Sequence, residues 1–445
     1  MAMNPNESSP TGATNRRDFL KTSSAAISGI IAAGSAAAVI VKPHSAFAAN
    51  TDTIKVGLVG CGGRGSGAAS QALHADKNVV LVGVADVFEN QAQGCLNALK
   101  NDASIADRVK VTPDHIFIGL DAFQKLIASG VDVVLLASPP GFRPQHLAAA
   151  IAANKHVFCE KPMATDAPGV RSVLASVDEA KKKNLSLVAG FCWRYESGRR
   201  EFYKRVLDGA IGDVRAVYAT YLTGPVKPMP PASTRPAGMG DVEWQLRNWY
   251  NFTWLSGDGL VEQACHSIDK IMWAMKDVPP IRAVGNGGRQ IPNNDGCIFD
   301  HIDVYFEWET GVRGFMAQRQ ISNCYSDNSD YLMGAKGIGI IKGWDAPIIK
   351  GAESWKYRGA KNDMYQTEHD ELFASIRSAT PINNGSWMAT STMAAILGRT
   401  AAYTGKEITW EEIMNSKDQL VPEGLTWTSK LPLPPMAVPG KTPFV

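Results

Sequence analysis

The chain has 445 residues, of which 45% are hydrophobic and 20% charged, and its formal charge is +2. The first 48 residues contribute all of that excess, from two arginines and two lysines against two acids, so the remainder is close to neutral. This balance speaks against nucleic-acid or acidic-membrane binding, and a remainder of roughly 400 residues exceeds one hydrophobic core, so two domains are expected.

The first 48 residues have the layout of an export signal. Arg16-Arg17-Asp18-Phe19-Leu20-Lys21 resembles the twin-arginine signal family, an apolar run follows over 25–41, and Ala46-Phe47-Ala48 fits a small-x-small cleavage site. We expect cleavage after Ala48; the alternative is an uncleaved anchor, although the run is short for spanning about 30 Å of hydrocarbon. The resemblance implies that the twin-arginine translocase exports a folded protein to the periplasm, often with its cofactor inside.

A dinucleotide fingerprint comes next. Lys55–Gly65 reads as an apolar strand that breaks into Gly60-x-Gly62-x-x-Gly65 and opens an Ala/Ser-rich helix. Such glycines permit a tight turn, close approach to a pyrophosphate and close packing of helix on strand; Gly63 and Arg64 lie in the same loop. Asp86 ends a second apolar run about twenty residues later, where a carboxylate would bind ribose hydroxyls. The alternative is that these glycines form a structural turn in another kind of α/β domain.

Residues 52–192 alternate strands and helices, the pattern of a parallel, doubly wound Rossmann domain. Strands are expected at Ile54–Val59, Val79–Val84, Val133–Ala137, His156–Cys159 and Leu185–Phe191. Helices are expected at Gly65–Ala75, Asn90–Lys100, Asp121–Ala128, Pro144–Ala153 and Pro168–Lys183.

Residues 193–425 predict a second α/β domain, for substrate binding and oligomerisation, with a large, mainly antiparallel open sheet. Its strands are expected at Val214–Leu222, Ile281–Val284, Ile298–Trp308, Gly314–Ile321 and Tyr331–Ile341. Its helices are expected at Arg199–Asp208, Gly259–Met275, Gln366–Arg377 and Ser386–Tyr403.

The tail and the cysteines complete the pattern. Residues 426–445 contain five prolines, which predict either a disordered end or an extended arm across a neighbouring subunit, and we favour the arm. Seven cysteines follow the signal with no CxxC pair, so neither a disulfide framework nor a zinc site is indicated; a single disulfide stays open.

Two clusters carry candidate chemistry. Cys159-Glu160-Lys161-Pro162 ends a strand of the parallel sheet, where ligands bind, and a lysine there would lower the pKa of a bound hydroxyl. Spacing alone leaves a solvated Glu-Lys pair as an equal alternative. Glu262-x-x-x-His266-x-x-Asp269 places three polar residues on one face of a helix, with a histidine able to exchange a proton and a carboxylate able to orient its ring. A surface pair is the alternative; no second His-rich cluster supports a metal.

With these motifs the chain resembles the Gfo/Idh/MocA oxidoreductases, which include glucose–fructose oxidoreductase and inositol dehydrogenase. The resemblance runs through the glycine loop, Ala137-Ser138-Pro139-Pro140 with His146, His156–Pro162 and the acid-x-x-x-His helix. It extends to Phe191–Tyr195 and Trp249–Asp258, which are most similar to exported members.

The resemblance implies roles for individual residues. Lys161 would be the catalytic lysine, His266 the proton acceptor and Glu262 the third catalytic residue, although Asp is commoner at that position. Ser138, Pro139, His146, Glu160 and Lys161 would join the glycine loop and Asp86 around the cofactor. Arg194 would lie near substrate, and Trp193, Tyr195 and Trp254 would offer a stacking surface with Trp249 and Tyr250; each aromatic is equally well a core residue. A homodimer or homotetramer is implied.

The predicted function is hydride transfer between a tightly bound nicotinamide and a secondary alcohol of a sugar or polyol, with no metal. Asp86 favours NAD over NADP because its charge repels a 2′-phosphate and Val87-Phe88 supply no arginine. One alternative keeps the fold but uses transient sugar oxidation for glycoside hydrolysis or elimination. Another is a non-catalytic periplasmic sugar-binding protein, against which the presence of both Lys161 and His266 argues.

Overall fold

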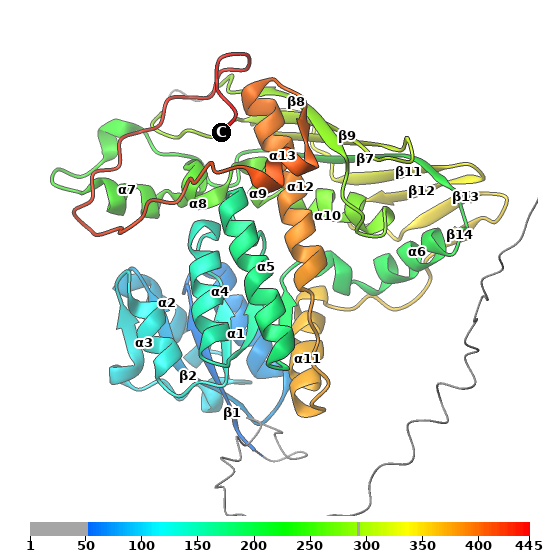
Figure 1. Cartoon of the computed structure of the whole chain (residues 1–445). Helices are drawn as coiled ribbons and strands as arrows, with labels where there is room; N and C mark the ends of the chain where they lie inside the picture. Colours follow the sequence, from blue (N-terminus) through cyan, green and yellow to red (C-terminus); the bar gives the residue numbers. More distant parts are fainter. Residues whose placement is uncertain (1–51, 292–293) are drawn as a thin grey trace, which may run out of the picture. The chain divides into compact units, whose positions relative to one another are not determined.

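The first part of the chain forms a parallel sheet covered by helices (Figure 1). The structure, a computed structural model, describes residues 52–291 and 294–445, so the predicted export signal and its cleavage site lie outside the described residues. Six parallel strands run in the order β3-β2-β1-β4-β5-β6. This is the Rossmann order, and it confirms the predicted N-terminal fold.

The strands are β1 (Ile54–Val59), β2 (Val79–Asp86), β3 (Ile116–Ile118), β4 (Val133–Leu136), β5 (His156–Cys159) and β6 (Leu187–Ala189). The helices are α1 (Gly63–Ala75), α2 (Glu89–Lys100), α3 (Ala122–Ala128), α4 (Arg143–Ala152) and α5 (Ala167–Lys182). The short edge strand β3 escaped sequence analysis because its three residues are too few to show a pattern.

The second part forms a nine-stranded sheet in the order β14-β13-β12-β11-β7-β10-β9-β8-β15. Every neighbouring pair is antiparallel except β7 and β10, so the predicted mainly antiparallel sheet is confirmed. The strands are β7 (Val214–Thr223), β8 (Arg282–Gly288), β9 (His301–Glu307), β10 (Arg313–Gln320), β11 (Ser329–Gly334), β12 (Gly337–Lys342), β13 (Ile348–Gly351), β14 (Trp355–Lys356) and β15 (Ile408–Thr409). The helices are α6 (Ser197–Leu207), α7 (Asp241–Arg247), α8 (Thr253–Ser256), α9 (Gly259–Glu262), α10 (Cys265–Ala274), α11 (Met364–Arg377), α12 (Gly385–Thr404) and α13 (Trp410–Asn415).

Two expected elements are wrong in detail. The single strand expected over Tyr331–Ile341 is the hairpin β11–β12, which turns at Ala335-Lys336. The single helix expected over Gly259–Met275 is interrupted between α9 and α10. Hydrophobic periodicity continues through both breaks, so the pattern alone could not reveal them.

The last helices return to the parallel sheet. Helix α11 packs on α1, and the segment after it runs beside β6, where the Leu187 N–H donates to the Ile382 carbonyl at 2.7 Å. One apolar core joins α5 and β6 to the inner face of the nine-stranded sheet through α12. In the described part of the chain, no helix is both long and apolar enough to cross a bilayer.

The proline-rich tail is ordered along its own chain, so the predicted disordered end is wrong; the arm across a neighbouring subunit stays a prediction. The Leu431 N–H donates to Asp241 at 3.2 Å, and the Leu431 carbonyl accepts from Gln245 at 3.1 Å. Further on, the Gly440 N–H donates to the Thr404 carbonyl at 2.8 Å. Figure 1 shows the tail, in red, running past α7 and α8. Proline content excludes regular structure but does not specify the surface on which an extended segment packs.

Candidate active site

A cavity of about 870 Å³ opens at the carboxyl ends of β1, β2, β4 and β5. Its opposite wall comes from the segment after β7, from the short helix Trp249–Asn251 and from α9 and α10. The volume is within the range of pockets that enclose a ligand of drug size or larger. Parallel sheets bind ligands at this edge, because loops and helix N-termini converge there.

The glycine loop forms one end of the cavity. Gly60 has a φ of +93°, and a Cβ there would lie 2.5 Å from the Ser138 nitrogen, so the turn excludes a side chain. A Cβ on Gly62 or Gly63 would meet nothing within 4 Å, and both residues line the cavity where α1 begins. Space beside backbone N–H groups at a helix N-terminus is what a pyrophosphate needs, so these residues fit a dinucleotide.

Asp86 lies at the end of β2 in the same cavity. Its carboxylate accepts from the Cys61 N–H at 2.7 Å and from the Phe88 N–H at 2.9 Å. Burial raises the pKa of Asp86, and those two backbone donors act against the rise. The carboxylate is therefore fixed between the glycine loop and the segment after β2, as ribose recognition requires.

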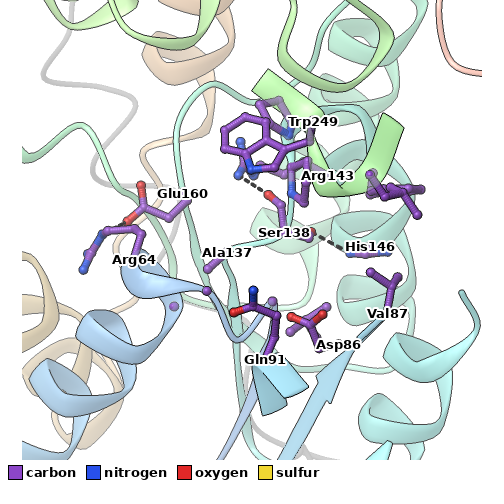
Figure 2. Close-up of a pocket in the computed structure, with 18 of the residues that line it drawn as sticks. Arg64, Asp86, Val87, Gln91, Ala137, Ser138, Arg143, His146, Glu160 and Trp249 are labelled. Atoms are coloured by element: carbon purple, nitrogen blue, oxygen red, sulfur yellow. Dashed lines mark hydrogen bonds and ion pairs between the residues drawn. The ribbon is translucent and has the colours of Figure 1, made fainter. Parts of the chain in front are cut away.

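The middle of the cavity floor is a polar cluster after β4, shown in Figure 2. Ser138 Oγ lies 3.0 Å from His146 Nδ1, and Arg143 donates to the Ser138 carbonyl at 2.5 Å and to the Pro162 carbonyl. Burial, reinforced by the Arg143 charge, lowers the pKa of His146 to about 3. His146 is thus a neutral positioning residue.

Arg64 joins the glycine loop to the end of β5. Its guanidinium pairs with Glu160 and, at 3.0 Å, with the buried Glu368 of α11; Figure 2 shows Arg64 and Glu160 facing each other. The Tyr365 ring lies 5.1 Å from the same guanidinium. All eleven residues predicted to bind the cofactor line this cavity: Gly60, Gly62, Gly63, Arg64, Gly65, Asp86, Ser138, Pro139, His146, Glu160 and Lys161.

Lys161 and Glu262 form a buried ion pair across the cavity. Lys161 Nζ lies 3.0 Å from Glu262 Oε1 and donates to the Glu262 backbone carbonyl at 2.6 Å. Burial lowers the pKa of Lys161, but the charge and hydrogen bond of Glu262, with smaller contributions from Cys265 and Glu160, together raise it above the ordinary value. The lysine is therefore a permanent cation here.

The interruption between α9 and α10 makes this contact possible. The His266 N–H bonds to the Gln263 carbonyl, and the Ala264 N–H bonds back five residues to Gly259. The Glu262 carbonyl, which His266 would occupy in a regular α-helix, is free to accept from Lys161. Irregular turns of this kind are frequent at functional sites.

His266 lines the cavity beside that pair. Burial lowers its pKa well below the ordinary value, with the Lys161 charge as the next cause. His266 Nδ1 and Glu262 Oε2 are both buried without a hydrogen-bond partner in the described residues. The expectation that a carboxylate one turn away orients the His266 ring is wrong, because Glu262 bonds to Lys161 and Asp269 bonds to Arg194 and Ser391. In residues 52–291 and 294–445, no group of three or more acids, histidines or cysteines could hold a metal.

Four residues predicted to bind substrate lie outside the cavity lining: Trp193, Arg194, Tyr195 and Trp254. Arg194 is bonded to Asp269 at 2.8 Å and to Asp277 at 2.5 Å. The Tyr195 hydroxyl donates to Asn384 at 2.6 Å, and the Trp254 Nε1 donates to Gln245 at 2.6 Å. Trp193 lies under the Arg199 guanidinium at 3.7 Å. These side chains hold the fold together, whereas Trp249 and Tyr250 do line the cavity.

Sequence reasoning missed several cavity residues. Arg143 follows the Ser138-Pro139-Pro140 turn, whose position at a strand end was a usable signal. Lys227 and Gln263 gave no such signal, because Lys227 lies in a proline-rich loop and Gln263 lies inside an apparently regular helix. All seven cysteines lie in the described residues and are free thiols.

Comparison with known proteins shows that residues 54–191 are similar to one family. They match the Gfo/Idh/MocA model, described as "Oxidoreductase family, NAD-binding Rossmann fold". Inositol 2-dehydrogenase of Agrobacterium fabrum is 34% identical over 170 residues, which are 38% of this chain and 46% of that protein. Inositol 2-dehydrogenase of Rhizobium meliloti is 29% identical over 73% of this chain and 86% of its own length.

Solved structures share the architecture. Levoglucosan dehydrogenase, in complex with NADH and levoglucosan, superposes with a TM-score of 0.63 at 17% identity, over 80% of this chain and 99% of that one. A putative myo-inositol dehydrogenase from Sinorhizobium meliloti gives 0.59 at 19% identity, over 80% and 99%. At these identities the likeness shows the fold.

Proposed function

We propose that this chain, whose residues 54–191 form a Gfo/Idh/MocA Rossmann domain, is an NAD-dependent oxidoreductase acting on a secondary alcohol of a sugar or polyol. The observation that carries the proposal is the convergence of Lys161, Glu262 and His266 in the cavity that the glycine loop and Asp86 also line. Both inositol 2-dehydrogenase relatives support the same reaction class.

The chemistry divides between the cofactor and the protein. Bound NAD would supply the hydride acceptor, held by Gly62, Gly63 and Asp86. His266, neutral because burial lowers its pKa, accepts the hydroxyl proton. Lys161 donates a hydrogen bond to the same oxygen and stabilises the alkoxide that develops as the proton leaves, a contribution of roughly 3–4 kcal/mol. Glu262 orients Lys161 and keeps it charged.

NAD, rather than NADP, is the proposed cofactor. Asp86 presents a fixed carboxylate where a 2′-phosphate would lie, and the Arg247 guanidinium that stacks on nearby Phe88 is paired with Glu243. Relatives of this fold have been solved with NADH, with NAD and with NADP, so the fold alone does not choose between them. The carboxylate carries the choice here.

Tight retention of the cofactor is part of the proposal. An apolar cluster joins α7 and α8 to the tail residue Leu431 and to Val87, Phe88 and Phe142 of the cavity wall. The Trp427 ring lies 6.1 Å from the Phe88 ring, and Arg247 stacks on Phe88 at 4.1 Å. A ligand behind this cover leaves only when packed contacts open, which slows dissociation.

Tight retention of the cofactor agrees with the predicted export signal, and export to the periplasm is part of the proposal. A twin-arginine signal implies a protein that folds, and loads its cofactor, before it crosses the membrane to the periplasm.

Oligomerisation is proposed from the exposed apolar side chains of the second sheet, among them Val284, Tyr305, Met333 and Ile338, each about two-fifths exposed.

One experiment tests the function. The purified protein is denatured to release and identify its nucleotide, and the loaded protein is incubated with sugars, polyols and aryl glycosides. Growth of the reduced-nicotinamide absorbance with a sugar or polyol is the expected result. Aglycone release without net reduction would replace the dehydrogenase with the NAD-recycling hydrolase or lyase, and binding without either reaction would leave a sugar-binding protein.

A further inference from the structure

Lys227 is one of the cavity cations that the proposed reaction does not use. It lies in the loop between β7 and α7 and lines the cavity beside Trp249 and Tyr250. Its ammonium lies 5.8 Å from the centroid of the Trp249 ring. Pro228 follows it, which restricts its backbone to extended conformations, and its carbonyl accepts from Asn251 at 3.1 Å. The backbone from which the Lys227 side chain projects is therefore held in place.

The charges around the cavity do not balance at this point. Lys161 is paired with Glu262, Arg64 with Glu160 and Glu368, and Arg247 with Glu243 at 2.8 Å. Within the described chain, Lys227 has no ion pair, and burial alone lowers its pKa, with no acid acting against the fall. A half-buried ammonium without an acid is costly unless a ligand supplies the anion.

The wall that holds Lys227 faces the proposed cofactor site. Figure 2 shows Trp249, the neighbour of Lys227, across the cavity from Asp86 and Gln91. Trp249 packs edge-on against Tyr250 at 5.6 Å. The Tyr250 hydroxyl accepts from Gln320 Nε2 at 2.5 Å, and Gln320 lies against Gly259 at the start of the helix that carries Glu262. Lys227 therefore lies in the wall that also carries part of the catalytic pair.

We propose that Lys227 binds an anionic group of the substrate, so that the enzyme oxidises an acidic sugar or sugar acid rather than a neutral one. The inference rests on the proposed function and narrows it. The ammonium would pair with a carboxylate at one end of the substrate, Trp249 would cover the carbon skeleton, and Lys161 and His266 would hold the reacting hydroxyl at the other. Arg143, a second cavity cation with no acid paired to it, adds positive potential.

The test compares matched substrates that differ only in a carboxylate against a CH₂OH group, such as glucuronate with glucose and gluconate with sorbitol. Glucose 6-phosphate and a sulfated hexose distinguish carboxylate from other anions. The loaded wild-type protein should show kcat/KM at least about tenfold higher for one anionic class than for its neutral partner.

The variants localise that preference. Lys227→Gln should raise KM for the anionic substrate roughly 10- to 100-fold with little change in kcat, and should leave KM for the neutral partner unchanged. Lys227→Arg should keep the preference, and Lys417→Gln, which alters an exposed lysine outside the cavity, should behave as wild type.

Three outcomes would overturn the inference. Equal or better turnover of the neutral partner would do so while leaving the oxidoreductase function in place. Loss of bound NAD from Lys227→Gln, with no change in substrate preference, would assign the lysine to the cofactor. If no compound in the panel reduces the nicotinamide, the proposed function fails instead, and calorimetry of glucuronate against glucose on the loaded protein still decides the role of Lys227: tighter glucuronate binding that Lys227→Gln removes supports it, and equal binding overturns it.

Discussion

Two of the buried ion pairs along the helical stretch from α9 to α10 differ in how fully they are bonded. Lys161 and Glu262 are 11% and 9% exposed, and Arg194 and Asp269 are 10% and 1% exposed. Asp269 accepts from Arg194 through both oxygens and from Ser391 at 2.7 Å, and Arg194 also stacks on Trp387 at 4.1 Å. Glu262 Oε2, by contrast, has no partner in the described residues.

The difference separates a structural pair from a reactive one. A saturated network holds its members in place and leaves no polar atom for a ligand. An unpartnered buried oxygen costs stability, and proteins retain such atoms where a substrate or cofactor completes the bonding. Glu262 Oε2 and His266 Nδ1 are such atoms beside the cavity, whereas Arg194, which sequence analysis assigned to substrate, lies in the saturated network.

Replacing Lys161 gives the largest expected effect. Lys161→Met should lower kcat/KM at least about 10³-fold, because the cation that stabilises the alkoxide is gone. The free energy of unfolding should also fall, because Glu262 is left charged and buried, so turnover is expressed per folded molecule. Turnover and denaturant melts on the same preparation measure both; turnover near wild type would remove Lys161 from the catalytic group.

Replacing Arg194 should lower stability without lowering activity per folded molecule. Arg194→Leu should cost about 3–5 kcal/mol of unfolding free energy, because Asp269 is left charged and buried. Activity per folded molecule should stay within about threefold of wild type, since the side chain does not reach the cavity. Urea titration with activity normalised to the folded fraction gives both quantities. A raised KM at unchanged stability would restore Arg194 to the substrate site.

Glu262→Gln should have a smaller effect on rate and a distinctive pH signature. The amide keeps the shape but removes the charge that raises the Lys161 pKa, so kcat/KM should fall roughly 10- to 100-fold at neutral pH. Burial then lowers the lysine pKa, and activity should be lost as pH rises at a lower pH than in wild type. Asp269→Asn is the matched control, and an alkaline limb shared by both variants would contradict the model.

The pH profile of the wild-type protein has the smallest expected effect. His266 must be neutral to accept a proton, and its pKa lies well below 6.5, so activity is lost only as pH falls through that lower value. Lys161 must be charged, and its raised pKa keeps it so beyond 10.5. Initial rates of alcohol oxidation should therefore be flat between about pH 6.5 and 9. A rate that halves near pH 6.5 would show that His266 is not desolvated as described.

Much of the cofactor side of the cavity was predictable from the sequence, whereas much of its substrate side was not. Gly60, Asp86 and Lys161 each follow an apolar strand, and strands of a parallel sheet end at one edge, so local pattern was enough to bring them together. Arg194 and Trp254 carried the same polar and aromatic signals as true cavity residues, yet their partners, Asp277 and Gln245, are supplied by tertiary packing.

By itself, the sequence determined that this chain has a Rossmann domain with a dinucleotide cradle, because glycine spacing and strand periodicity are local properties of the backbone. It also singled out the lysine and the histidine of the cavity. Only the tertiary structure decided that the helix breaks at Gln263, so that the Glu262 carbonyl reaches Lys161. It also decided that Lys227 stands without an acid and that the tail closes on its own chain. These outcomes depend on which distant segments of the chain pack against one another, and local sequence patterns do not show those contacts.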